Sequence, residues 1–358
     1  MAHPTSLPRR SRGLSLIELM IAMTIGLFLL TALASVYLGA STSNRELTRS
    51  ARQIEDGRYS IQAISEDLSL AGYFGYFYSP VTPSAIPDPC ELLPSQASLR
   101  VPLQGYDSPA SPASPLSGCL ADADHVAGTD VLVVRRADTN VSVGGTIADG
   151  SSTLVANELY VQANSDTSNS SNPLIAVGNT PGTYPLLLKD SATRAPVRKL
   201  HVQIYYVAPC SVPTGGGSSC TGASDDNGRP IPTLKRLELR VDSGGALAWV
   251  VTPIAEGVEM LQVEYGLDAN GDGVPDGAFV AAPASAADWA NVVAANVYLI
   301  VRNTEPSSGY TDMKSYALGV AGTMTSTANG GTLDPNYKRK AYSAQVRLVN
   351  PASRRETP

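Results

Sequence analysis

The feature that most constrains this chain is an apolar run near its N-terminus, Leu14 to Leu38, which reads LSLIELMIAMTIGLFLLTALASVYL. At ~1.5 Å per residue, a helix over this run is long enough to cross the ~30 Å hydrocarbon core of a membrane. Three arginines, Arg9, Arg10 and Arg12, precede the run and should stay cytoplasmic by the positive-inside bias. The sequence therefore predicts that the part of the chain after Leu38 is exported across the inner membrane.

One carboxylate, Glu18, lies inside the apolar run, where an ionisable side chain is costly and is functional by default. An ordinary secretory signal gains nothing from such a residue, although Ala32-Leu33-Ala34 supplies the small-x-small triplet that signal peptidase cuts. A plain secretory signal or membrane anchor is therefore the alternative interpretation of this segment.

The residues around Glu18, from Gly13 to Ala22 (GLSLIELMIA), resemble the processing and methylation motif of type IV prepilins and pseudopilins. The resemblance implies that a membrane-embedded prepilin peptidase cuts after Gly13 and methylates the new N-terminal residue, Leu14. Cleavage creates a cationic α-amine at Leu14, which can neutralise a carboxylate that is otherwise uncompensated in an apolar setting. If Leu14 and Glu18 pair between neighbouring subunits, processing permits assembly and sets the register of the packed helices.

The helix should continue beyond the membrane, because no proline occurs between the leader and Pro80. Apolar residues in this stretch also recur at spacings of three, four or seven residues. These residues are Ala51, Ile54, Ile61, Ile64, Leu68 and Ala71. Gly72 is the expected stop. We expect one helix from Leu14 to Ala71, with a membrane and assembly half (14–38) and an amphipathic half (39–72) that packs on the globular domain.

Residues 73–358 are predicted to form one large, loop-rich antiparallel β domain, since several segments alternate apolar and polar residues and the chain holds 31 Gly and 26 Pro. The strand candidates are 130–136, 159–162, 201–207, 234–241, 246–251, 291–302 and 342–349, the last of which should end the domain. The Pro- and Ser-rich segment 80–115 is expected to be a surface loop without regular elements, and 140–185 is expected to be a variable loop.

Four cysteines, Cys90, Cys119, Cys210 and Cys220, all lie beyond the apolar run, where an exported domain meets an oxidising compartment. Proximity in the sequence favours disulfides between Cys90 and Cys119 and between Cys210 and Cys220, although three connectivities and four free thiols remain open. No CxxC pair supports a zinc or redox site.

A second motif, DANGDGVPD, resembles a Ca²⁺ loop. It places Asp268, Asn270, Asp272 and Asp276 at positions one, three, five and nine, with the Val274 carbonyl at position seven. Hard oxygen ligands at this spacing suit Ca²⁺, so the loop could bind this ion, although the chain requires no cofactor.

Position twelve of the same loop holds Phe279, where a Ca²⁺ loop of the EF-hand type needs a bidentate Glu. Affinity would therefore be weak unless a remote carboxylate completes the shell, and Glu264 is one nearby candidate. The alternative is an ordinary turn between strands whose acidic groups face water.

The remaining sequence gives no sign of catalysis. It contains no GxSxG, GxxxxGK[ST] or HExxH motif, and the histidines that remain after the leader, His125 and His201, are expected to be ordinary residues. The formal net charge of -6, near -9 without the leader arginines, does not suggest nucleic acid. The run Lys338-Arg339-Lys340, with Arg354 and Arg355, is expected to be a solvated edge or a subunit contact.

The C-terminal region resembles minor pilins of the PilW type in four stretches: GVEMLQVEYG from Gly257, DANGDGVPD, VYLIVRN and YKRKAYSAQVRLVN. Together with the N-terminal motif, this implies an α+β, type IV pilin-like fold and a structural subunit that primes or caps type IV pilus assembly after cleavage at Gly13-Leu14, rather than an enzyme.

The resemblance also implies partners: prepilin peptidase, other minor pilins, the major pilin and a tip adhesin. It implies a single-pass inner-membrane protein with a periplasmic C-terminal domain, which then joins the filament or its tip. The alternatives are a type II secretion pseudopilin and, from another class, an exported surface- or carbohydrate-binding domain on a plain signal anchor.

Overall fold

The computed structural model describes residue 13 and residues 15–77, 83–110, 115–145, 154–166, 172–179 and 183–355. Residues 1–12 of the predicted leader and the predicted methylation site, Leu14, lie outside the described residues, as do parts of the segments 80–115 and 140–185. The chain divides into two units, Met1–Ala51 and Arg52–Pro358.

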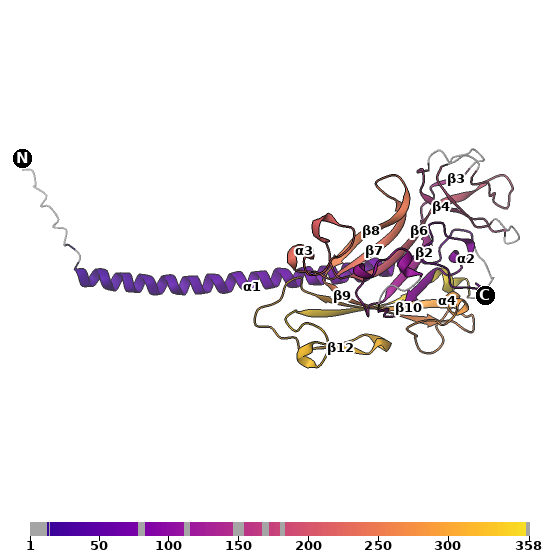
Figure 1. Cartoon of the computed structure of the whole chain (residues 1–358). Coiled ribbons are helices and arrows are strands. Elements are labelled where there is room, and N and C mark those ends of the chain that lie inside the picture. Colours follow the sequence, from indigo (N-terminus) through magenta and orange to yellow (C-terminus); the bar gives the residue numbers. More distant parts are fainter. Residues whose placement is uncertain are drawn as a thin grey trace, which may run out of the picture. The chain divides into compact units, whose positions relative to one another are not determined.

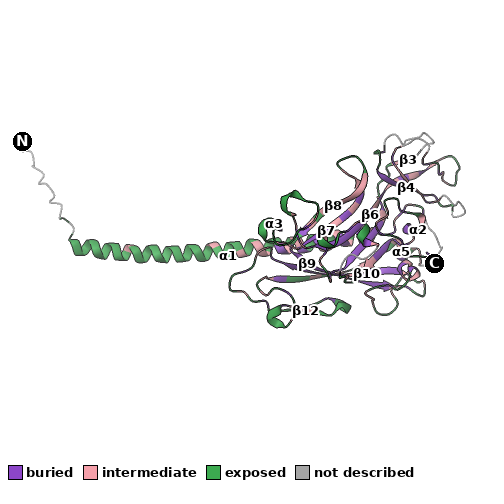
Figure 2. Cartoon of the chain, viewed as in Figure 1, coloured by how far each residue is buried: buried purple, intermediate pink, exposed green. Residues whose placement is uncertain are grey.

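The long helix is present as α1 (Leu16–Leu70), one unbroken element of 55 residues (Figure 1). From Leu16 to Leu38 its large apolar side chains are 50% to 78% exposed, so the described residues leave this apolar surface uncovered (Figure 2). The hydroxyls of Thr24, Thr31 and Ser35 donate to carbonyls one turn earlier, which satisfies them without water. By length and composition this stretch can cross a membrane.

In the second unit, α1 presents one face to the core. Ile64, Leu68 and Ala71 are fully buried on this face, as the periodicity predicts. Nearer the start of the unit the buried positions are small or polar, because β13 approaches closely: a Cβ on Gly57 would lie 2.2 Å from the Tyr342 ring. The helix ends as predicted at a glycine, Gly72, whose φ of 76° suits the left-handed region.

The globular unit is mainly β. Its first strands are β1 (Leu103–Tyr106), β2 (Val131–Ala137), β3 (Val143–Gly145), β4 (Leu159–Gln162), β5 (Leu174–Val177), β6 (Arg194–Ala208), β7 (Thr233–Val241) and β8 (Leu247–Glu256). The later strands are β9 (Val258–Leu267), β10 (Val292–Arg302), β11 (Ser315–Ala317), β12 (Thr323–Thr325) and β13 (Arg339–Arg347). The short helices are α2 (Gln96–Leu99), α3 (Asp225–Gly228), α4 (Ala286–Ala290) and α5 (Val349–Ser353).

These strands form two main antiparallel sheets. In the first, the long strand β6 pairs with β2 and β7 through its second half and with β3 and β4 through its first half; β1, β5 and β8 lie at the edges. The second has the order β13-β10-β9, and β11 and β12 form a separate hairpin. The largest core cluster combines residues of α1, such as Leu68, with Tyr205 of the first sheet and Val297 of the second. The end of α1 is therefore packed between the two sheets.

Each of the seven predicted strands is confirmed, 159–162 with its predicted ends and the other six with shifted ends, but three expectations are wrong. The segment 80–115 contains α2 and β1, because Val101 and Leu103 are buried in the core and β1 pairs with β2. The segment 140–185 contains β3 and β5 besides β4. The domain does not end on its last strand, since α5 follows β13 and buries Ala352.

A buried carboxylate, Asp67, attaches α1 to the first sheet. It accepts hydrogen bonds from Arg136 Nε (2.8 Å) and from the Tyr205 hydroxyl, and Arg236 Nη1 lies 3.6 Å away. Burial and the neighbouring Asp67 carboxylate raise the pKa of Tyr205, so its hydroxyl stays a donor. Strands β2, β6 and β7 thus converge on one side chain of the helix.

A second buried carboxylate, Asp130, joins the two sheets. It precedes β2 and accepts hydrogen bonds from the backbone N–H groups of Ser108 (2.8 Å) and of Val263 in β9 (2.7 Å). Burial raises the pKa of Asp130 to about 7, although these two N–H groups oppose the rise. The junction between the sheets is therefore sensitive to pH near neutrality.

Replacing Asp67 with Asn should lower the free energy of unfolding of the Arg52–Pro358 unit by about 3 kcal/mol, because the half-buried Arg136 would lose its charged partner. Urea unfolding followed by circular dichroism measures the loss. The matched control is Glu66→Gln at the exposed neighbouring position, which should change it by less than about 0.5 kcal/mol. Equal effects of the two changes would show that Asp67 is not the attachment point.

The free energy of unfolding should fall as pH rises from about 5 to 7, because carboxyl groups whose pKa is lowered, such as Glu238, add an opposite slope only at lower pH. Between the unfolded pKa of Asp130 (about 3.9) and its folded pKa of about 7, the native state binds more protons than the unfolded state. The slope from this group is at most about 1.4 kcal/mol per pH unit. Burial lowers the pKa of His125, which gives an opposite slope below about pH 6.5, so the measurement is made in a His125→Gln background. In that background Asp130→Asn should flatten the curve, and an unchanged slope would contradict the assignment.

Candidate functional site: the N-terminal segment and two ordered loops

Helix α1 begins at a capping box made by Ser15 and Glu18. The Glu18 carboxylate accepts a hydrogen bond from the backbone N–H of Ser15 at 2.9 Å, and the Glu18 N–H donates to Ser15 Oγ at 3.4 Å. This reciprocal pair satisfies the first turn of the helix and places a negative charge at its positive end. The sequence motif therefore has a local structural function that the spacing from Ser15 to Glu18 could have revealed.

Glu18 is also the one charged side chain between Gly13 and Asn44. Its carboxylate turns toward the N-terminal end of the helix, where Ser15 is the described partner. Leu14 directly precedes Ser15 in the chain, so an α-amine at Leu14 would be one residue from the group that already binds Glu18.

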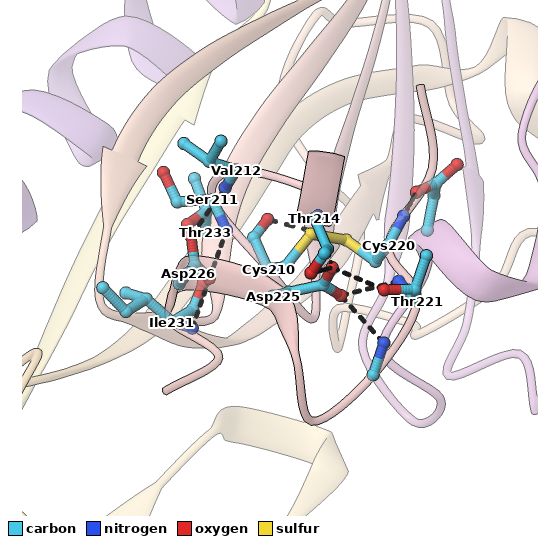
Figure 3. Close-up of a disulfide and its surroundings, with 12 residues drawn as sticks. Cys210, Ser211, Val212, Thr214, Cys220, Thr221, Asp225, Asp226, Ile231 and Thr233 are labelled. Carbon is cyan, nitrogen blue, oxygen red and sulfur yellow. Dashed lines mark hydrogen bonds between the residues drawn. A yellow bond between two sulfur atoms is a disulfide. The ribbon is translucent and has the colours of Figure 1, made fainter. Parts of the chain in front are cut away.

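The structure forms two disulfides, Cys90 with Cys119 and Cys210 with Cys220, the pairing that sequence proximity favours. No cysteine of the chain is free. Asp225 lies beside the second disulfide (Figure 3), but both sulfurs of that pair are bonded to each other and offer no thiolate to a metal. Both bridges are therefore structural.

The loop closed by Cys210 and Cys220 is ordered by Asp225. Its carboxylate accepts hydrogen bonds from the backbone N–H groups of Thr214 (2.8 Å), Thr221 (2.6 Å) and Gly222 (2.8 Å) and from both threonine hydroxyls (Figure 3). Burial favours the neutral acid, but these bonds outweigh it and lower the pKa of Asp225. The side chain is thus an anchor for a turn and not a proton donor.

Asp226 holds the other side of the same loop. Its carboxylate accepts from the backbone N–H groups of Ser211 (3.0 Å), Val212 (2.7 Å) and Ile231 (2.8 Å), as Figure 3 shows. Sequence reasoning missed both aspartates, although the run Asp225-Asp226-Asn227-Gly228 is a turn signal.

The predicted Ca²⁺ loop follows β9. Asn270 Nδ2 lies 3.1 Å from Asp272 Oδ2 and 3.1 Å from Asp276 Oδ1, so three of the predicted ligands meet at one turn. The other Asp276 oxygen accepts from the backbone of Ala269 (2.7 Å) and Asn270 (3.0 Å). The carboxylates therefore act as acceptors for their own turn, and each retains lone pairs that a hard cation could use.

Asp268, the first predicted ligand, is bonded to the backbone of the same turn. Its carboxylate accepts from the backbone N–H groups of Gly271 (2.6 Å) and Gly273 (2.9 Å). Glu264, named as a remote ligand, lies elsewhere: it accepts from Val320 N and from Asn296 Nδ2 (3.2 Å) on the face of the second sheet. Its placement contradicts the expectation that it completes the loop.

The expectation that Lys338-Arg339-Lys340 forms a solvated edge or a subunit contact is wrong for Arg339. Arg339 is fully buried and pairs with both carboxylate oxygens of Glu259 (2.6 and 3.2 Å) and with Asp312 (3.2 Å). These partners lie far from Arg339 in the sequence, so no local pattern could predict them. This network attaches the connection between β10 and β13 (303–338) to the second sheet.

The two histidines that the structure describes, His125 and His201, each contact a residue of the globular unit. His125 is buried and its Nε2 lies 3.0 Å from the Thr129 carbonyl; burial lowers the pKa of His125. His201 Nδ1 lies 3.2 Å from Glu238 on the adjacent strand β7, and this hydrogen bond is the first cause that lowers the pKa of Glu238 to about 2. The buried Nδ1 of His125 has no hydrogen-bond partner among the described residues, so only one of its two ring nitrogens is satisfied.

Two protein families match the chain. The Prokaryotic N-terminal methylation motif matches residues 8–34, and Type IV Pilus-assembly protein W (PilW) matches residues 219–350. The first match covers Gly13, Leu14 and Glu18, and the second covers the Asp268–Asp276 loop and β13. No curated protein sequence is significantly similar to the chain.

Among solved structures, the chain is similar to the "Type IV-like pilin TTHA1219 from Thermus thermophilus", at 12% identity and over 84% of this chain and 97% of that chain. The TM-score is 0.32, too low to bear on the fold. The similarity of the chain to pilins therefore rests on the two family matches.

Proposed function

We propose that the chain is a type IV pilus minor pilin of the PilW type, which the two family matches support, and that it is cleaved between Gly13 and Leu14, methylated at Leu14, and joined through α1 to other pilins. In this proposal it enters the inner membrane as a single-pass protein with a periplasmic globular unit. It then primes or caps a filament, and its partners are prepilin peptidase, other minor pilins, the major pilin and a tip adhesin.

The observation that carries this proposal is the position of Glu18. The carboxylate lies in the apolar segment, four residues after Leu14, at which the proposed cleavage starts the mature chain. Its hydrogen-bond partner among the described residues is the backbone N–H of Ser15. In a filament the α-amine of a neighbouring subunit supplies the missing positive charge. The subunit acts by packing and by this charge pair, without turnover of a substrate.

Glu18→Ala should be cleaved normally but enter filaments at a level reduced by about tenfold or more, since an unpaired α-amine would be buried in the helix bundle. Immunoblots of sheared filaments and of whole cells measure incorporation, and the mobility of the cell-associated band reports cleavage. The matched control, Glu46→Ala, removes a carboxylate from the polar half of the same helix and should incorporate normally. Normal incorporation of Glu18→Ala would refute the charge-pair proposal.

We also propose that the Asp268–Asp276 loop binds Ca²⁺ weakly, through oxygens of Asp268, Asn270, Asp272, Asp276 and the Val274 carbonyl. The meeting of Asn270, Asp272 and Asp276 at one turn supports this proposal, and the absence of a Glu at position twelve accounts for the weak binding.

Isothermal titration calorimetry with CaCl2 should give a dissociation constant of about 1 mM for the unaltered chain. Asp272→Ala should abolish the signal, because it removes one of the three side chains that converge. Asp242→Ala is the control, since Asp242 caps a different β-turn through Gly244 and Ala246 and should leave binding unchanged. No binding by the unaltered chain at millimolar CaCl2 would remove the site.

A further inference from the structure

The strand β13 forms one edge of the second sheet. Each of its nine residues is paired with a residue of β10, and β10 is its neighbour in the sheet. In an antiparallel pair, alternate residues of a strand direct their N–H and C=O groups to the partner, so the other residues of β13 direct theirs away from β10. Among the described residues, no backbone group outside β10 bonds to the backbone of residues 340–347. The outer edge of β13 therefore presents a row of open hydrogen-bonding groups.

The other edge strands that the structure describes are short or interrupted. β1, β3, β5, β11 and β12 have three or four residues each. β8 contains Pro253, which has no N–H, and its pairing with β7 includes a register shift. The outer side of β9 is used by Asp130, whose N–H donates to the Leu261 carbonyl (2.9 Å) and whose carboxylate accepts from Val263. A long, regular and unblocked edge such as β13 is a site at which another chain can add a strand.

The basic residues around β13 differ in whether the chain supplies their counterion. Arg339 pairs with two carboxylates, as described above. Arg355, just after α5, donates to the Asp268 carbonyl (2.9 Å) and lies 3.5 Å from the carboxylate of the same residue. Lys340, by contrast, is exposed and has no acidic partner among the described residues. The expectation of a subunit contact at this basic run therefore stays open for Lys340.

The charge of β13 restricts what can pair with it. The strand holds Arg339, Lys340 and Arg347 and no acidic residue, and the exposed Lys340 and Arg347 lie near its two ends. An added strand with carboxylates near its ends would meet both cations. A second copy of β13 would instead bring cations next to cations, and like charges on neighbouring strands are destabilising. The edge therefore favours an acidic segment of another protein over a second copy of this chain.

We propose that β13 is the docking site for an extended acidic segment of another protein, which adds to the three-stranded second sheet as a further strand. The open backbone groups of β13 supply the hydrogen bonds, and Lys340 and Arg347 select a segment with carboxylates near both ends. The inference concerns the Arg52–Pro358 unit alone. It therefore holds or fails independently of cleavage at Gly13 and of filament assembly.

The probe for this site is a peptide of about seven residues, with Glu at each end and alternating Val and Thr between them. The alternation matches β13, in which half-buried Tyr342 and Val346 alternate with exposed Ser343 and Gln345. Fluorescence anisotropy measures its binding to the full chain in a zwitterionic detergent and about 0.01 M NaCl, where charges are weakly screened. The peptide should bind at least about tenfold more tightly than the same peptide with Lys at each end.

Lys340→Glu should weaken binding of the Glu-ended peptide at least about fivefold and strengthen binding of the Lys-ended peptide, because it reverses the charge at one end of the strand. Lys189→Glu makes the same change at an exposed site between β5 and β6 and should bind like the unaltered chain. Hydrogen exchange locates the site: the Glu-ended peptide should slow exchange at residues 340–347 and leave β8 unchanged.

Three results would overturn the proposal. Equal binding of the Glu-ended and Lys-ended peptides would refute selection by charge, and this comparison needs no variant of the protein. Binding of a Glu-ended peptide that is methylated on every backbone nitrogen between its ends would refute strand addition, since such a peptide has no N–H groups there to donate. Absence of peptide binding, with slow exchange at residues 340–347 before any peptide is added, would show that a second copy of the chain occupies the edge.

Discussion

The interaction on which the folded unit most depends is the attachment of α1 to the sheets through Asp67. The helix enters an apolar core that contains Ile64 and Leu68, yet its fixed orientation relative to β2, β6 and β7 comes from one carboxylate that meets Arg136 and Tyr205. Hydrophobic packing alone would tolerate sliding, whereas directed hydrogen bonds to a buried charge fix the register.

Asp67 and Glu18, two carboxylates on the same helix, differ in whether a cation lies beside them. Asp67 has its cations within the folded chain. Glu18 has a backbone N–H and no cation among the described residues, and it lies in a stretch whose apolar side chains are exposed. An exposed apolar helix with an uncompensated charge is an incomplete structure, and other copies of such a helix can complete it. This difference connects the geometry of the subunit with its function in a filament.

The sequence was most informative where a periodic pattern of apolar residues extends over many residues. The helix and the long strands other than β9 were predictable because apolar residues recur over many turns or alternate over whole strands. Strands β1, β3 and β5 have three or four residues each and lie in Pro-, Ser- and Gly-rich segments, so their pairing depends on distant partners. The burial of Arg339 and the docking of Arg355 were likewise beyond sequence reasoning, because Glu259 and Asp268 lie about eighty residues or more away.

The central claim of this account is that the chain becomes an assembly subunit only when its N-terminus is processed. Mass spectrometry of the N-terminal peptide from isolated membranes tests it most directly. The account predicts a peptide that begins at Leu14 and carries a methyl group on its α-amine. A peptide that begins at Ser35, after the Ala32-Leu33-Ala34 triplet, or an intact Met1 would contradict it.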